Sequence, residues 1–190
     1  TVQPSTYVPP VPNNYANTET FDNTKDEVWA ALINTASTSF FSITNFEKDS
    51  GLMTLEFGGD PEDYIDCGTW TGDGFTDANY ILRNKAMGFD MRLSGVINIL
   101  VLEIDDNRTS LRVSARYILN MSISGSTYNV IAGINVPFST SDTFSFDSNG
   151  FDTISITNPA VGTISTRTCQ PNGLAESQIT DDISELLEVL

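Results

Sequence analysis

Histidine is missing from this 190-residue sequence, and its absence narrows the chemistry that the chain can perform. Histidine is the commonest general base and metal ligand near neutral pH, so carboxylates, hydroxyls and two cysteines are what remains. We therefore expect a protein that is not an enzyme and that uses no cofactor.

Basic residues are also scarce. The chain has 9 lysines and arginines against 25 aspartates and glutamates, which gives a formal net charge of −16, and no basic run interrupts this balance. The resulting field repels nucleic-acid phosphates and anionic lipid head groups, so we expect no nucleic-acid partner. Charged residues make up only 18% of the chain, while Ser, Thr and Asn are plentiful. This composition is typical of secreted or periplasmic β-rich proteins.

Cysteine occurs only twice, as Cys67 and Cys169. An even pair in a chain of exported character indicates a disulfide, which would close a long loop and stabilise the fold by about 4–5 kcal/mol. The alternative is two separate buried thiols. A catalytic cysteine is disfavoured because no histidine is present to activate it.

Long apolar runs are missing too: no stretch reaches the length of about 18 residues that a membrane-spanning helix needs. Residues 1–20 are rich in Pro and Asn and are predicted to be a flexible linker. Such a segment resembles the spacer that follows a bacterial lipid-anchored N-terminus, and an ordinary tail leading into a domain is the alternative. Residues 21–190 are predicted to form a single domain.

Two helices are predicted from capping and periodicity. Thr24 and Glu27 form a capping box, followed by the apolar stripe of Val28, Trp29, Leu32, Ile33 and Ala36. A second amphipathic helix is predicted to begin near Asn172-Gly173 and to dock on a sheet. Its apolar face contains Ile179, Ile183, Leu186, Leu187 and Leu190, and its acidic face contains Asp181, Asp182, Glu185 and Glu188.

Between the helices, alternating residues predict strands. The segments 40–46 and 52–57 form a hairpin, and 91–102 and 111–124 form two long strands. The second half of 91–102 is apolar on both faces and is predicted to be covered on both. Gly95 and Gly125 are expected bend points. A further strand near 127–136 and a hairpin turning at 147–150 complete the sheet, with a register that the pattern leaves open.

These elements predict an α+β fold, with a curled antiparallel sheet of five to seven strands, an N-terminal helix and a C-terminal helix, as in a helix grip. The motif Phe21-Asp22-Asn23-Thr24-Lys25-Asp26-Glu27-Val28-Trp29-Ala30-Ala31-Leu32, followed by Phe46-Glu47-Lys48-Asp49-Ser50-Gly51-Leu52, resembles the opening of bacterial outer-membrane lipoprotein domains of the BamC type. This resemblance covers the first third of the chain. It implies an envelope-located accessory module that contacts other proteins without catalysis.

Residues 60–88 show weak periodicity and are predicted to be a long loop. The loop contains Tyr64, Trp70, Phe75 and Tyr80, which are candidates for a partner-binding surface, since loop aromatics are favoured anchors in recognition. The alternative is that these rings hold the loop against the sheet.

The same segment is rich in carboxylates, and they include Asp60, Glu62, Asp66, Asp73 and Asp77. Their oxygens form a weak candidate calcium site, because the spacing misses the EF-hand pattern, and a solvated acidic loop is the favoured interpretation. Arg112 and Arg116 lie on the solvent face of the predicted strand 111–124. They would hold an anionic ligand or pair with neighbouring carboxylates.

The sequence therefore predicts a non-catalytic cell-envelope lipoprotein or periplasmic interaction module. Its partner is expected to be another envelope protein, and its only membrane contact a possible lipid at the N-terminus. The alternative from another class is a helix-grip carrier that binds an apolar small molecule between the sheet and the C-terminal helix.

Overall fold

The computed structural model describes residues 5–72, 74–158 and 163–188, which form four helices and twelve strands. In chain order these are β1 (Thr6–Val8), β2 (Thr18–Phe21), α1 (Lys25–Thr38), β3 (Ser42–Glu47), β4 (Leu52–Gly59), α2 (Pro61–Tyr64), β5 (Ile65–Asp66), β6 (Thr69–Gly72), β7 (Phe75–Asn79), α3 (Tyr80–Ala86), β8 (Asp90–Asp105), β9 (Arg108–Asn129), β10 (Ile134–Asp147), β11 (Asp152–Asn158), β12 (Thr163–Pro171) and α4 (Leu174–Glu188). The predicted α+β class, antiparallel sheet and terminal helices are confirmed. Within the described ranges, no helix is long and apolar enough to span a membrane.

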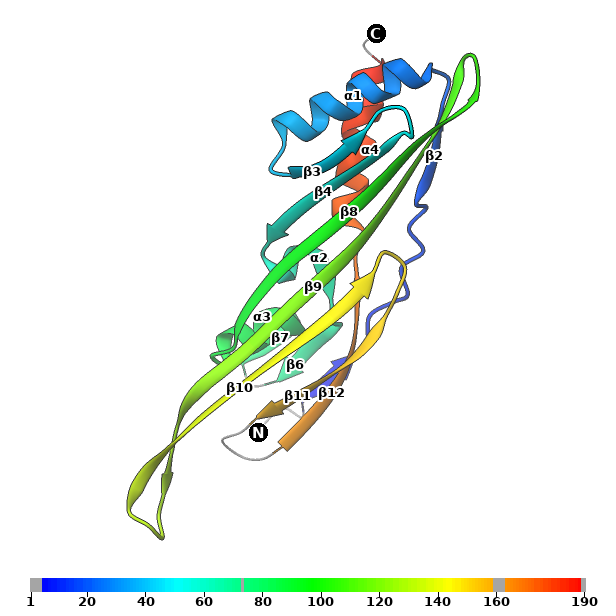
Figure 1. Cartoon of the computed structure of the whole chain (residues 1–190). Coiled ribbons are helices and arrows are strands. Elements are labelled where there is room, and N and C mark those ends of the chain that lie inside the picture. The colour runs from blue at the N-terminus through cyan, green and yellow to red at the C-terminus, as the bar shows by residue number, and fades with distance from the viewer. Residues whose placement is uncertain (1–4, 73, 159–162, 189–190) are drawn as a thin grey trace.

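The main sheet has six antiparallel strands in the order β10-β9-β8-β4-β3, with β2 also paired to β9. Two three-stranded sheets, β1-β6-β7 and β11-β12-β5, lie beside it (Figure 1). Alternate residues of the long strands point to one side, where α1 and α4 pack together against the sheet. The buried side chains on this inner face include Met53, Leu55, Phe57, Leu93, Ile97, Ile99, Val101, Leu111, Val113, Tyr117 and Leu119.

The start of α1 follows its sequence signal. Thr24 accepts a hydrogen bond from the Glu27 amide, and the Glu27 carboxylate accepts one from the Thr24 amide at 2.8 Å, so the predicted capping box is confirmed. By contrast, the outer face of β8 is not covered as predicted. Leu102 and Ile104 are 48% and 49% exposed because both long helices pack on the inner face.

Two glycines permit aromatic rings to lie across neighbouring strands. Gly95 on β8 is the pairing partner of Phe57 on β4, and Gly125 on β9 is the partner of Phe138 on β10. A Cβ atom at Gly95 would overlap the Phe57 ring, which packs between Phe41, Tyr64 and Tyr117. The absence of a side chain at Gly95 is therefore a packing requirement of the core.

The substitution Gly95→Ala tests this requirement. We expect it to lower the free energy of unfolding by about 1–3 kcal/mol, because the added methyl group must displace a packed ring. Urea unfolding followed by circular dichroism measures the change. Gly58→Ala is the comparison, because the added Cβ atom meets no aromatic ring there and comes within 3.3 Å only of the Leu93 carbonyl oxygen. Equal stability of Gly95→Ala and the parent chain would contradict the packing role.

The predicted linker is instead part of the fold. β1 pairs with β6, β2 pairs with β9, and the Asn17 carbonyl accepts a hydrogen bond from the Val113 amide at 2.8 Å. Farther along, the Asn13 amide donates to the Gln170 side chain at 3.2 Å. The prediction of a flexible linker over 1–20 is wrong for residues 5–20, because the exposed edges of β6 and β9 supply backbone partners that the segment's own composition does not reveal.

Residues 60–88 are likewise not one long loop. They contain α2, β5, β6, β7 and α3, apart from residue 73, which lies outside the described residues. Each of these elements has two to seven residues. Such lengths are too short for a helical or strand period to repeat, so the sequence pattern missed them.

The structure also settles the register that the pattern left open. β9 continues to Asn129, a turn spans residues 130–133, and β10 returns from Ile134, so the predicted single strand at 127–136 is wrong. A turn does occur at residues 147–150, but β11 then pairs with β12 and not with β10. The partner of β11 is therefore β12, which is distant in sequence from the turn at 147–150.

The predicted disulfide between Cys67 and Cys169 is confirmed. Both residues are fully buried, and the bond links the connection between β5 and β6 to β12 across 102 positions of sequence. The bond therefore fixes the end of β12, just before α4 begins at Leu174.

Removing this disulfide should cost substantial stability. We expect the double variant Cys67→Ser, Cys169→Ser to lose about 4–5 kcal/mol of unfolding free energy, because the unfolded chain regains the freedom of a long loop. Equilibrium urea unfolding of the variant and of the oxidised and reduced parent measures the loss. Both thiols should resist alkylation under denaturing conditions until a reductant is added. Labelling without a reductant would show that the bond does not form.

Candidate functional site

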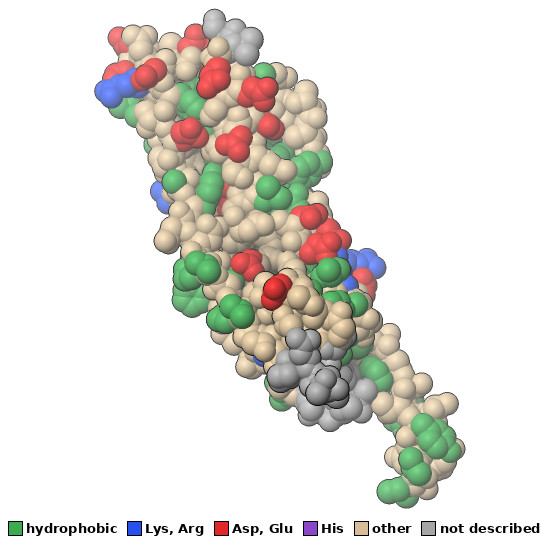
Figure 2. Space-filling view, turned by 180° about the vertical axis from the view of Figure 1, so that it is seen from behind, with side chains coloured by type: hydrophobic (Ala, Val, Ile, Leu, Met, Phe, Trp, Pro, Cys, Tyr) green, Lys and Arg blue, Asp and Glu red, His purple; other side chains and the backbone are tan. Residues whose placement is uncertain are grey.

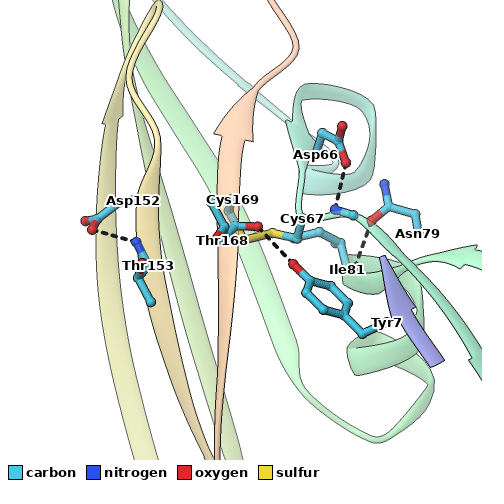
Figure 3. The surroundings of a disulfide bond; sticks show 10 residues. Tyr7, Asp66, Cys67, Asn79, Ile81, Asp152, Thr153, Thr168 and Cys169 are labelled. Carbon is cyan, nitrogen blue, oxygen red and sulfur yellow. Dashed lines mark hydrogen bonds between the residues drawn. A yellow bond between two sulfur atoms is a disulfide. The ribbon is translucent and has the colours of Figure 1, made fainter. Parts of the chain in front are cut away.

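The disulfide organises the side chains around it. Gln170 and Pro171, which follow Cys169 on β12, pair with Asp66 and Ile65 of β5. The Asp66 carboxylate accepts a hydrogen bond from the Gly68 amide at 2.8 Å, and the Tyr7 hydroxyl donates to the Thr168 carbonyl at 3.3 Å (Figure 3). The N-terminal strand β1 is thereby held against β12 at the disulfide.

Three aromatic rings meet here, and each comes from a different element. The ring centroid of Tyr80 on α3 lies 5.7 Å from that of Tyr7 on β1 and 6.0 Å from that of Trp70 on β6, both edge-on. The structure thus brings together two of the predicted aromatic residues, Trp70 and Tyr80, but Tyr80 is fully buried, so its predicted place on a binding surface is wrong and it supports the two half-buried rings from inside. Tyr7 was missed because its segment was interpreted as a linker.

Two arginines stack on these rings. The guanidinium carbon of Arg83 lies 4.2 Å from the Trp70 ring centroid, and that of Arg167 lies 4.4 Å from the Tyr7 centroid and 4.8 Å from the Tyr80 centroid. Arg83 follows Tyr80 by three positions on α3, so both side chains lie on one side of the helix. We call Tyr7, Trp70, Tyr80, Arg83 and Arg167 the aromatic–arginine cluster.

Arg167 is unusual in this acidic chain. It donates to the Thr166 carbonyl at 2.6 Å, and no ion pair joins it to a carboxylate in the described part of the chain. Its Nε and the Trp70 Nε1 are buried atoms without a hydrogen-bond partner among the described residues. Burial raises the pKa of the Tyr7 phenol, so this hydroxyl stays protonated beside Arg167. Among the described residues, the cluster therefore has no carboxylate for Arg167 and no acceptor for its Nε.

The other predicted surface residues lie elsewhere. Tyr64 is buried against Phe57 and Tyr117, with ring centroids 5.4 Å and 6.5 Å away, so its predicted place on a binding surface is wrong. It anchors α2 in the core. Phe75 is half-buried on β7 and is not a member of the cluster.

The two predicted arginines of β9 are on the outer face of the main sheet, as expected. Arg116 pairs with Asp147 at 2.9 Å and borders an open hollow of about 620 Å³, whereas Arg112 is exposed four residues away. Hydrogen bonding to Asp147 raises the pKa of Arg116 further. Arg116 thus follows the pairing alternative, and neither arginine contributes to the cluster.

The acidic residues of 60–77 contact several different groups, and Asp60 and Glu62 share one of them. Asp60 caps α2 and contacts Lys85, which holds the pKa of this carboxyl below its usual range, and Glu62 lies 3.7 Å from the same lysine. Asp66 accepts from Gly68, and Asp77 accepts from the Thr71 hydroxyl at 3.0 Å. Among the described residues, no three His, Cys, Asp or Glu side chains converge as a metal site. Asp73 lies outside the described residues.

One polar pair in the core was missed from the sequence. Tyr117 on β9 donates a hydrogen bond to Glu176 on α4, and both residues are fully buried. Burial, followed by the nearby Glu176 charge, strongly raises the pKa of the Tyr117 phenol. The signal was available: Glu176 stands three positions before Ile179, so helical spacing places it on the buried face of α4.

Comparison of the chain with protein-family models, curated proteins and solved structures finds no match. The contacts described above are thus the basis for any functional conclusion.

The substitution Tyr117→Phe tests the buried pair. It leaves the Glu176 carboxylate without its hydrogen-bond donor, so we expect a loss of about 1–3 kcal/mol of unfolding free energy near neutral pH. In the parent, the raised pKa keeps the phenol protonated in the folded state, so this contribution is present below pH 10 and is lost as pH rises above the unfolded value of 10.0. Urea unfolding at several pH values measures both effects. A parent and variant that respond identically to alkaline pH would contradict them.

Proposed function

We propose that this chain is a non-catalytic interaction module of an oxidising cell-envelope compartment and that it contacts another envelope protein through the aromatic–arginine cluster. The observation that carries the proposal is Arg167, which stacks on Tyr7 and Tyr80 without a carboxylate partner in the described part of the chain. Tryptophan, tyrosine and arginine are the residues that dominate binding energy at protein interfaces.

The charge pattern indicates what the partner presents. With 25 acidic against 9 basic residues, the overall field of the chain repels an acidic partner, whereas the cluster places two guanidinium groups on the half-buried rings of Tyr7 and Trp70. A partner segment with an acidic side chain next to an apolar one complements this surface. Its carboxylate accepts hydrogen bonds from the Arg167 guanidinium, and its apolar group covers the half-buried rings.

The compartment is inferred from chemistry and composition. A fully buried disulfide is consistent with an oxidising environment, and a surface that relies on Ser, Thr and Asn supports export. The resemblance to outer-membrane lipoprotein domains of the BamC type agrees with this location. The proposal covers both a form anchored by a lipid at the N-terminus and a form free in the periplasm.

The carrier alternative has less support. It requires an open pocket of several hundred Å³ between the sheet and α4. In the described residues, this space is packed with Phe57, Tyr64, Tyr117, Glu176 and Ile179, each at most 6% exposed. No specific observation favours a carrier over an interaction module.

Photo-crosslinking in the native envelope tests the proposed surface. A photoreactive residue at Ser165, which is half-buried and lies two positions before Arg167 on the same face of β12, should form an adduct with one protein. We expect Arg167→Gln to reduce the yield about tenfold or more, because a central arginine contact is worth roughly 2 kcal/mol.

Two further variants control this experiment. Arg167→Lys should retain part of the yield, since it keeps the charge but loses the planar stacking. Arg116→Gln removes an arginine of the outer face that already has a carboxylate partner, and it should leave the yield unchanged. A yield that responds equally to Arg116→Gln and Arg167→Gln would show only a general charge effect and would overturn the proposed site.

A further inference from the structure

The hairpin of β9 and β10 projects beyond the body of the protein. β8 begins at Asp90, which pairs with Ser122, and past this point β9 and β10 continue as a ribbon of two strands. We call residues 123–140 the arm: strand residues 123–129, a turn at 130–133, and strand residues 134–140. Figure 1 shows the arm extending from the end of the sheet that is remote from α1.

The arm lies within a long segment without charge. No Asp, Glu, Lys or Arg occurs from Tyr117 to Ser141, in a chain whose net charge is −16. Figure 2 shows acidic side chains over the body and apolar side chains at the end of the arm. A projecting surface hairpin normally gains solubility from charged residues, so this distribution requires an explanation.

The tip of the arm exposes large apolar side chains at the turn and on both faces of the ribbon. Ile131, at the turn, is 100% exposed, and Val130 is 83% exposed. Tyr128 and Ile134 are also exposed and belong to adjacent residue pairs of the ladder, so they point to opposite faces of the ribbon. A flat or grooved protein surface would cover one of these faces, whereas a fluid apolar medium surrounds them all.

Three backbone amides of the turn already have hydrogen-bond partners within the arm. The amides of Ile131 and Ala132 each donate to the Asn129 side-chain oxygen at 3.0 Å, and the Gly133 amide donates to the Asn129 carbonyl at 2.8 Å. Three donors that would otherwise lose hydration on entering an apolar phase are therefore already satisfied.

From these observations we propose that the tip of the arm inserts into the surface of a lipid bilayer whose head groups are uncharged overall. Val130 and Ile131 enter the edge of the acyl region, and the Tyr128 ring lies at head-group level. The acidic body is repelled by anionic lipid, so a neutral bilayer is the favoured surface. This contact is distinct from any lipid at the N-terminus and does not depend on the aromatic–arginine cluster.

Insertion is limited to the tip. Past Ser122, the outer edges of β9 and β10 have no strand neighbour in the described part of the chain, so their backbone groups need water or head groups. The hydroxyl-bearing residues Ser124, Ser126 and Ser139 share the face of the Tyr128 pair nearer the body. The stem of the arm therefore stays outside the acyl region.

Vesicle co-sedimentation of the chain of residues 1–190 tests the proposal. We expect binding to phosphatidylcholine vesicles and weaker binding when about a third of the lipid is phosphatidylglycerol, with the difference shrinking at high salt as charges are screened. The variant Ile131→Asp should lower the partition coefficient at least about tenfold, because a charged side chain cannot enter the acyl region. Phe46→Ser, which alters an exposed apolar residue on β3, should not change it.

Fluorescence measures the depth of insertion. A tryptophan introduced by Ile131→Trp should be quenched by brominated acyl chains, whereas one introduced by Ser124→Trp should not, relative to the parent with its two native tryptophans. Absence of vesicle binding by the parent, or equal binding by Ile131→Asp, would overturn the proposal. If vesicles do not bind but a photoreactive residue at Tyr128 captures a protein in an Ile131-dependent manner, the occupant of the tip is a protein and the lipid proposal is wrong. Loss of lipid binding would leave the Arg167-dependent adduct unchanged, so the two proposals fail separately.

Discussion

The length of β9 is the constraint on which the rest of the structure depends. This strand has 22 residues and spans roughly 70 Å, far more than α1 or α4 can cover. Its edges are therefore occupied piece by piece: β8 on one side, and β2 and β10 on the other. Between β2 and β10, Asn17 and Ser148 satisfy the backbone groups of Val113 and Ala115. Where these neighbours stop, the arm remains as a two-stranded extension.

Charge is distributed along this axis in a way that separates the two proposed contacts. The aromatic–arginine cluster holds Arg167 on the half-buried ring of Tyr7 and the buried ring of Tyr80, so its proposed complement is a carboxylate with an apolar neighbour. The arm tip has no Asp, Glu, Lys or Arg, so electrostatic attraction cannot guide it, and its proposed complement is an apolar phase. The body's acidity discourages other contacts. Each surface is therefore expected to bind a different kind of partner.

The sequence predicted those features that depend on neighbouring residues. It did not predict strands that form by pairing with a strand distant in sequence. The capping box of Thr24 and Glu27 depends on four consecutive residues, and the disulfide was the only pairing that two cysteines allow. Tyr7, in contrast, is placed by pairing with Trp70, more than sixty positions away. The composition of that segment predicted a linker. The sequence of a short strand does not show that a distant strand has an unpaired edge to which it can bind. The uncharged run from Tyr117 to Ser141 was a readable signal for the arm.

The buried pair of Tyr117 and Glu176 shows how α4 is held in one orientation. An apolar helix face tolerates small rotations, but a buried carboxylate must keep its donor, and Tyr117 lies on the inner face of the strand that organises the sheet. Glu176 also stands in the first turn of α4, where the helix dipole favours a negative charge. Because β12 leads directly into α4, fixing the helix also fixes the strand that carries Cys169 and Arg167. The geometry of the cluster is thus set by two restraints on β12: the disulfide to Cys67, and the hydrogen bond that fixes α4 in the core.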